Sequence, residues 1–120
     1  MKVLGLIPSR MGSRRLPAKA LLPISGLPLV VHTYRRANLS KLIDKILICT
    51  DSKKIVSIAK KYKSKAILTS PHHLNGTERI AEAFVKEKKK YDFILDIQGD
   101  EPLISPYHID EVIKYHKKNN

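Results

Sequence analysis

The fold is decided first by residues 2–21, which read KVLGLIPSRMGSRRLPAKAL. The run from Lys2 to Pro8 is short, continuous and apolar, as is typical of a strand that is covered on both faces of a parallel sheet. The residues after it predict a loop, because Gly12 and Pro17 interrupt regular structure. Cationic side chains crowd this loop, namely those of Arg10, Arg14, Arg15 and Lys19. The sequence therefore opens with a buried strand that leads directly into a cationic loop.

Strand and helix patterns alternate beyond this loop. Further strands are predicted at residues 21–24, 44–50, 65–69 and 92–98. Helices are predicted to begin at Pro28, after an N-cap at Asp51 or Ser52, near Thr77 and at Pro106. This alternation predicts an α/β fold, in which a Rossmann-like parallel sheet carries helices on both faces. Residues 1–120 suit one domain or part of one.

Several side chains have a plain structural interpretation. Cys49 lies in the apolar run of a predicted strand, so a core position is expected. Asp96 falls inside the strand predicted at 92–98, where a charged group needs a partner or a place near the sheet edge. His72 and His73 have no third ligand at suitable spacing, so a plain loop is predicted there rather than a metal site. The helix over residues 77–88 is expected to bury Ile80, Ala81, Phe84 and Val85.

The order of the strands brings two loops together. If the strands at 2–8, 44–50 and 65–69 run outward in one direction, the strand at 92–98 lies on the other side of the first. Ligands bind beyond the carboxyl ends of such strands, where the strand order reverses. The cationic loop then faces the segment QGDEP at 98–102.

Cations opposite a carboxylate suit a nucleoside triphosphate with magnesium. Arg and Lys hold phosphate oxygens, and a carboxylate holds the metal, which bridges the phosphates. Composition alone leaves a surface turn with incidental arginines as an equal alternative for the loop. Glu101 also has two open interpretations, a metal ligand beside Asp100 or a cap or ion-pair partner. The chain lacks the phosphate-loop pattern G-x-x-x-x-G-K-[ST] and the dinucleotide pattern G-x-G-x-x-G.

Charge and composition limit the remaining classes. The net charge is +12, which fits either a polyanion-binding module or a lysine-rich enzyme surface. We favour the second, because aromatic platforms for stacking bases are few. A single cysteine excludes an internal disulfide. Neither a signal peptide nor a run of about 18 apolar residues is present, so a cytoplasmic chain without membrane insertion is expected.

Three stretches of the chain match the motifs of one enzyme family. NGTERIAEA is similar to the segment S-G-T-E/D-R-x-A-E-A, and DIQGDEPLI is similar to N-x-Q-G-D-E-P-x-I. The opening I-P-A-R-x-x-S-x-R-L-P-G-K-x-L is matched at Ile7, Pro8, Arg10, Ser13, Arg15, Leu16, Pro17, Lys19 and Leu21. In these motifs the chain resembles the CMP-Kdo synthetases, the 3-deoxy-manno-octulosonate (Kdo) branch of the sugar-nucleotide cytidylyltransferases. The resemblance extends over residues 3–113, nearly the whole chain.

The resemblance implies a nucleotide-diphospho-sugar transferase type of fold and a nucleotidyltransferase activity. In the family reaction, the anomeric hydroxyl of Kdo attacks the α-phosphorus of CTP and gives CMP-Kdo, for lipopolysaccharide biosynthesis, and pyrophosphate. Lys19, Arg10 and Asp100 are implied to be catalytic, with Asp100 as the ligand of the cofactor Mg²⁺. Nucleotide contacts are implied for Ser9, Arg10, Ser13, Arg15, Lys19, Asn75, Gly76, Thr77, Arg79 and Gln98.

Members of the family are longer, with a second half that encloses the sugar acid. We therefore expect residues 1–120 to be the N-terminal nucleotide-binding part, which binds CTP and does not complete catalysis alone. The expected partners are CTP and Kdo, with a homodimer for a full-length chain and no nucleic acid. Three alternatives stay open: a cytidylyltransferase for another sugar acid, of the sialic-acid or spore-coat type; a CTP-binding fragment without turnover; and a basic nucleic-acid-binding module.

Overall fold

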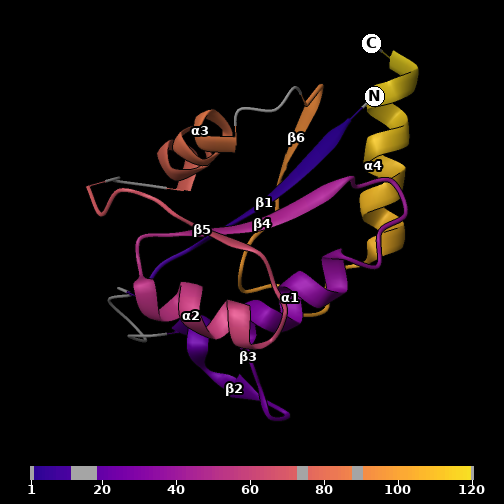
Figure 1. Cartoon of the computed structure of the whole chain (residues 1–120). Coiled ribbons are helices and arrows are strands. Elements are labelled where there is room, and N and C mark those ends of the chain that lie inside the picture. Colours follow the sequence, from indigo (N-terminus) through magenta and orange to yellow (C-terminus); the bar gives the residue numbers. More distant parts are fainter. Residues whose placement is uncertain (1, 12–18, 73–75, 88–90, 120) are drawn as a thin grey trace.

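A four-stranded parallel sheet forms the centre of the molecule (Figure 1). The structure is a computed structural model, and it describes residues 2–11, 19–72, 76–87 and 91–119. Across the sheet the order is β5-β4-β1-β6. These strands are β1 (Val3–Ser9), β4 (Lys45–Thr50), β5 (Ala66–Leu68) and β6 (Phe93–Asp96). The order confirms that the last strand lies beside the first, on the side opposite to the other two.

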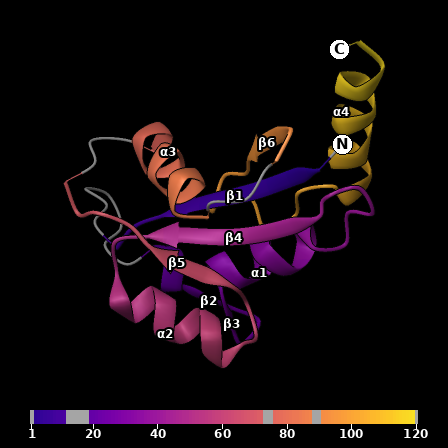
Figure 2. The same cartoon turned by 45° about the horizontal axis from the view of Figure 1, so that its top comes forward.

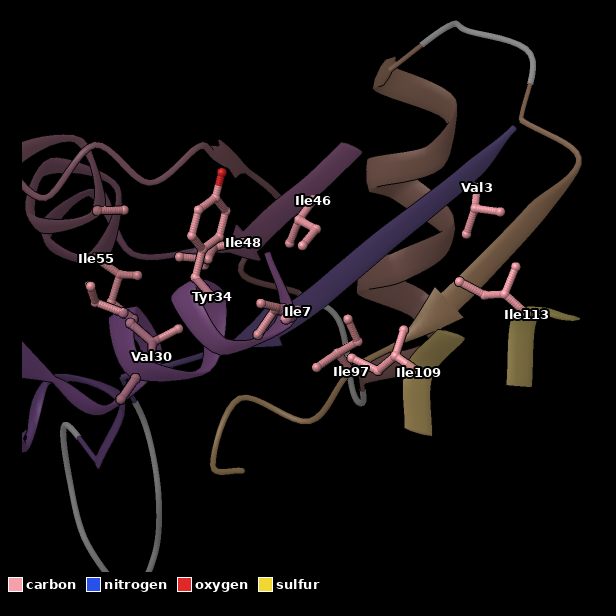
Figure 3. Close-up of a cluster of buried hydrophobic side chains, with 14 residues drawn as sticks. Val3, Ile7, Val30, Tyr34, Ile46, Ile48, Ile55, Ile97, Ile109 and Ile113 are labelled. Carbon is pink, nitrogen blue, oxygen red and sulfur yellow. The ribbon is translucent and has the colours of Figure 1, made fainter. Parts of the chain in front are cut away.

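Different helices cover the two faces of the sheet, which confirms the predicted α/β class. One face carries α1 (Leu29–Ala37), α2 (Lys53–Lys61) and α4 (Pro106–Asn119), whereas α3 (Gly76–Glu87) lies on the other (Figures 1 and 2). Figure 3 shows the larger core cluster, where side chains of α1, α2 and α4 meet those of the sheet. Among the residues that the structure describes, no helix has both the length and the apolar character that crossing a membrane requires.

The continuous apolar run of β1 has a direct cause in this layering. Val3 and Ile7 point into the larger cluster, and Leu4 and Leu6 point into the smaller cluster beneath α3. Successive side chains of a strand face opposite ways, so a strand that is covered on both sides needs apolar residues at every position. The smaller cluster also contains Cys49, which confirms its expected place in the core.

Strand β4 leads into helix α2, whose N-terminus is capped. Ser52 is the N-cap of α2, and its Oγ accepts a hydrogen bond of 3.2 Å from the backbone N–H of Ile55. Serine is favoured here because its side chain satisfies one of the free donors in the first helical turn. Of the two predicted caps, Ser52 is therefore correct, and Asp51 is left to form another interaction.

Three predicted strands differ from the structure. Residues 21–24 are not one strand: a 3₁₀ turn (η1, Lys19–Leu21) precedes β2 (Pro23–Ile24), which pairs antiparallel with β3 (Leu27–Pro28). Ser25 and Gly26 both have positive φ, 50° and 85°, and this backbone suits the tight turn of a hairpin. The strands predicted at 65–69 and 92–98 are shorter, as β5 and β6 show.

The buried face of α3 also differs from the prediction. Ile80 and Phe84 pack against the smaller cluster, as predicted. Val85, however, is 69% exposed and Ala81 is exposed, whereas Arg79 and Ala83 are buried. Hydrophobic periodicity assumes that an arginine faces solvent. Here Arg79 has partners inside the protein, and α3 is rotated so that this side chain faces the sheet.

Candidate functional site

The two loops predicted to face each other meet at the carboxyl edge of the sheet. The Nζ of Lys19 lies 3.0 Å from the Oδ2 of Asp100, within hydrogen-bonding distance. Lys19 belongs to η1, at the end of the cationic loop, and Asp100 follows β6. Both side chains are about half exposed, 45% and 50%, so a ligand can reach them. The reversal of strand order between β1 and β6 therefore brings a cation and a carboxylate together, as the sequence predicted.

A cavity of about 310 Å³ lies at this point. One wall comes from the end of β1 and η1, and the opposite wall from the segment after β6. Its cationic groups are Arg10 and Lys19, and its acidic group is Asp100. The lining residues are Pro8, Ser9, Arg10, Lys19, Ala20, Leu29, Gln98, Gly99 and Asp100. The structure thus brings together Ser9, Arg10, Lys19, Gln98 and Asp100 from the set of predicted site residues.

The backbone at Gly99 lies very close to β1. A Cβ atom placed on Gly99 would lie 3.3 Å from the carbonyl oxygen of Pro8, tighter than almost all real contacts of that kind. Two residues earlier, the chain still continues the sheet pairing, because the N–H of Ile97 donates a 2.9 Å hydrogen bond to the carbonyl of Leu6. Glycine therefore allows the segment to turn tightly over the end of β1, and this places Asp100 at the cavity.

Arg79 occupies a second, buried position at the same edge of the sheet. Its Nη1 donates to the Oγ1 of Thr69 at 2.8 Å, and its Nη2 lies 3.7 Å from the Oδ2 of Asp51. Arg79 is only 4% exposed, and neither Arg79 nor Thr77 lines the cavity described above. The guanidinium joins the ends of β4 and β5 to the first turn of α3.

Periodicity and motif spacing missed this interaction. The available signal was the position of Asp51 directly after β4, at the edge of a parallel sheet where ligands bind.

The other residues singled out in the sequence are described only in part. Ser13, Arg15 and Asn75, with Arg14 and His73, lie outside the described residues. His72 is described and exposed in the turn before that gap. Glu101 is exposed, next to Asp100.

Asp96 and Cys49 have raised pKa values for the same physical reason. Asp96 is exposed at the end of the edge strand β6, as one of its predicted interpretations required, and partial desolvation of its carboxyl raises the pKa. Its Oδ1 accepts a long, 3.4 Å hydrogen bond from the side-chain amide of Gln98. Burial also raises the pKa of the Cys49 thiol to about 12. This thiol stays protonated at neutral pH, as expected for a core residue rather than a nucleophile.

The donor set at the cavity fits magnesium that arrives with a nucleotide. Within the described ranges, no group of three or more His, Cys, Asp and Glu residues could hold a metal ion by itself. Mg²⁺ is commonly held by one or two carboxylates together with substrate phosphates and water. Asp100 supplies one such carboxylate beside the cations Arg10 and Lys19. The arrangement can therefore neutralise a polyphosphate and hold its metal ion.

The sequence profile of the cytidylyltransferase family matches residues 4–120. The chain belongs to this family. Among curated cytidylyltransferases, the 3-deoxy-manno-octulosonate cytidylyltransferase of Chlorobium phaeobacteroides is 46% identical over 110 residues, which are 92% of this chain and 44% of that protein. The mitochondrial protein of that name from Arabidopsis thaliana is 42% identical, over 94% of this chain and 39% of that protein.

A related activity occurs among the similar cytidylyltransferases. The 8-amino-3,8-dideoxy-manno-octulosonate cytidylyltransferase of Shewanella frigidimarina is 39% identical, over 99% of this chain and 49% of that protein. The chain thus spans about half, or somewhat less, of the length of the curated cytidylyltransferases it matches.

Solved cytidylyltransferase structures agree with this assignment. CMP:2-keto-3-deoxy-manno-octonic acid synthetase, solved in complex with CTP, superposes with a TM-score of 0.92 at 34% identity, over 98% of this chain and 48% of that one. A cytidylyltransferase from Leptospira borgpetersenii superposes with a TM-score of 0.81 at 30% identity, over 96% of this chain and 48% of that one. The sheet and its covering helices are therefore those of a nucleotidyltransferase.

Proposed function

We propose that this chain supplies the CTP site of an enzyme that transfers a cytidylyl group from CTP to Kdo. The observation that carries the proposal is the meeting of Lys19 and Asp100 across a cavity that also contains Arg10. The likeness to a synthetase solved with CTP supports the choice of nucleotide. The products are CMP-Kdo and pyrophosphate, and we assign CMP-Kdo to lipopolysaccharide biosynthesis.

The reaction is a displacement at phosphorus. The anomeric hydroxyl of Kdo forms a bond to the α-phosphorus of CTP, and the bond from that phosphorus to the oxygen bridging to the β-phosphorus breaks. The hydroxyl proton passes to solvent, and the electron pair of the broken bond leaves with pyrophosphate. Such a step requires alignment and charge neutralisation rather than covalent help from the protein.

The chain's own residues divide the work by their position. Lys19 and Arg10 bind phosphate oxygens and offset the negative charge that grows on pyrophosphate. Asp100 is the proposed ligand of Mg²⁺, which neutralises phosphate charge when it is bound. Ser9 and Gln98 lie at the cavity and can bind the nucleotide through hydrogen bonds.

We assign the remaining nucleotide contacts to two groups. In the cationic loop, Ser13 and Arg15 are proposed to bind phosphate. Asn75, Gly76 and Thr77 are proposed to contact the cytosine and ribose. Arg79 is proposed to support the base side from its buried position against Thr69, because its donors already have partners inside the protein.

The sugar acid is the finer part of the proposal. Similar proteins are named for Kdo and for its 8-amino-8-deoxy analogue, so these are the two acids to compare. The natural-length protein that carries these residues is incubated with labelled CTP, Mg²⁺ and one of the two acids. A parallel reaction contains N-acetylneuraminic acid instead. CMP-Kdo as the main product supports the proposal. A main product from either of the other acids contradicts it.

The compartment and the partners are proposed on the same basis. Bacterial relatives support a cytoplasmic location, and the mitochondrial relative from Arabidopsis thaliana gives the alternative that cell fractionation would detect. Nucleic acid is not an expected partner. Retention of RNA on a filter that falls steeply with salt would contradict this expectation.

A further inference from the structure

Helix α1 contacts both ends of the segment that carries Asp100. The Oγ1 of Thr33 donates a 2.9 Å hydrogen bond to the carbonyl of Gly99. One turn further along α1, the Nε of Arg36 donates a 2.9 Å hydrogen bond to the carbonyl of Ile104. Residues three apart on a helix share a face, so one face of α1 holds both ends of residues 99–104.

The contact at Gly99 is partly buried, and its donor comes from inside the protein. Thr33 has no exposed surface, and its hydroxyl also lies 3.4 Å from the carbonyl of Leu29 in its own helix. Removing the hydroxyl would leave the partly buried Gly99 carbonyl without this donor, and losing a hydrogen-bond partner at such a position is costly. On its other side, Gly99 is close to the carbonyl of Pro8. The backbone just before Asp100 is thus held between α1 and β1.

The segment's own contacts are weaker than these. Its backbone hydrogen bonds are long: the N–H of Glu101 donates to Gln98 at 3.3 Å, and the N–H of Ile104 donates to Glu101 at 3.2 Å. The side chain of Asp100 pairs with Lys19, but exposed ion pairs of this kind contribute little to stability. The two donors of α1 therefore give the segment its firmest side-chain anchors.

We propose that Thr33 and Arg36 are positioning residues for the metal and nucleotide site. They fix the backbone on either side of Asp100 and so aim its carboxylate at the metal ion that accompanies the triphosphate. This inference rests on the proposed function. Residues that orient a metal ligand usually affect metal affinity even though they do not touch the metal.

The test measures CTP affinity by calorimetry, with Mg²⁺ and in metal-free buffer. The variants Thr33→Val and Arg36→Met each remove one anchor. Thr33→Ser keeps the hydroxyl, and Arg35→Met removes an equal charge from the neighbouring residue of α1. Anchor loss should weaken CTP binding about tenfold in Mg²⁺ and leave binding in metal-free buffer within about twofold of the unaltered chain.

The outcomes separate a positioning role from a structural one. Thr33→Ser and Arg35→Met should retain the effect of Mg²⁺. Equal losses of affinity with and without Mg²⁺, or no loss, would overturn the inference. If Thr33→Val unfolds, as circular dichroism would reveal, Arg36→Met decides, because its side chain is exposed. An unaltered chain that does not bind CTP in Mg²⁺ contradicts the proposed function itself, and the inference with it.

Discussion

Lys19 and Asp100 are 81 residues apart in sequence, yet the Nζ of one lies 3.0 Å from a carboxylate oxygen of the other. Each group thus partly neutralises the other when no nucleotide is bound. In the proposed complex their partners change: Lys19 binds phosphate and Asp100 binds the metal ion. The ion pair is half exposed, so little free energy opposes this exchange.

Substitution of Lys19 should remove stabilisation of the negative charge that develops on pyrophosphate in the transition state. We expect Lys19→Ala to reduce kcat/KM by roughly two to three orders of magnitude, about 3–4 kcal/mol of transition-state free energy, of the order found for donors to a developing negative charge. The measurement is steady-state synthesis of the CMP-sugar by the natural-length protein. A rate within about threefold of the unaltered enzyme would remove Lys19 from its role.

Substitution of Asp100 should have opposite effects with and without metal. Asp100→Asn removes the proposed ligand of Mg²⁺, so the increase in CTP affinity caused by Mg²⁺ should be largely lost. It also removes the carboxylate that pairs with Lys19. In metal-free buffer, CTP should therefore bind the variant more tightly than it binds the unaltered chain. Calorimetry in both buffers measures the two effects. An unchanged dependence on Mg²⁺ would exclude Asp100 as the metal ligand.

The buried pair of Arg79 and Asp51 should matter for folding. Asp51→Leu would leave the guanidinium of Arg79 buried without its carboxylate, which typically costs about 3 kcal/mol or more. Because Asp51 is 24% exposed, we expect about 2–3 kcal/mol, measured by urea denaturation. As a control, Glu111→Leu breaks an exposed pair with Lys114 and should change stability by less than about 1 kcal/mol. Equal effects of both variants would argue against a structural role for the buried pair.

Asp110 predicts how stability responds to acid. Burial alone would raise the pKa of this carboxyl, but hydrogen bonds from the Ser40 hydroxyl and the backbone N–H groups of Lys41 and Leu42 outweigh it and lower the pKa. The resulting stabilisation is present above about pH 4, the ordinary value, and is lost as pH falls through the lowered folded-state pKa. Urea denaturation of the unaltered chain and Asp110→Asn should differ most near neutral pH and converge in acid. A constant difference would contradict this.

Lys45 predicts the opposite trend in alkali. Its side chain donates a hydrogen bond to the Glu87 carboxylate, which raises the pKa of Lys45 despite the opposing effect of burial. This stabilisation is complete below about pH 10, the ordinary range for lysine, and is lost as pH rises through the raised folded-state pKa. We expect Lys45→Met to lower the free energy of unfolding by about 1 kcal/mol at pH 8 and by less as pH rises above that range.

The central sheet was predictable because layering leaves a direct trace in sequence. A strand buried on both faces must be apolar throughout, as in residues 3–7, and the alternation of elements then limits the strand order. That order was sufficient to bring Lys19 and Asp100 together. The strand predicted at residues 21–24 was wrong because the turn at Ser25 and Gly26 makes a short hairpin beside the sheet. The apolar character of these residues does not distinguish a hairpin strand from a strand of the central sheet.

Hydrophobicity predicted the buried face of α3 only in part. Arg79 is buried because Asp51 and Thr69, which come from two other strand ends, meet it in space. Such a partnership depends on contacts between distant residues, so periodicity within one helix cannot reveal it. The contacts of Thr33 and Arg36 with residues 99–104 were hidden for the same reason.

The proposed function requires that the residues lining the cavity between β1 and β6 bind CTP. The most direct measurement is an NMR titration of the isotope-labelled chain with CTP, UTP and ATP in Mg²⁺. We expect saturable binding of CTP, weaker binding of UTP and ATP, and the largest chemical-shift changes at Arg10, Lys19, Gln98, Gly99 and Asp100. Equal binding of ATP, or shifts centred away from these residues, would contradict the proposed function.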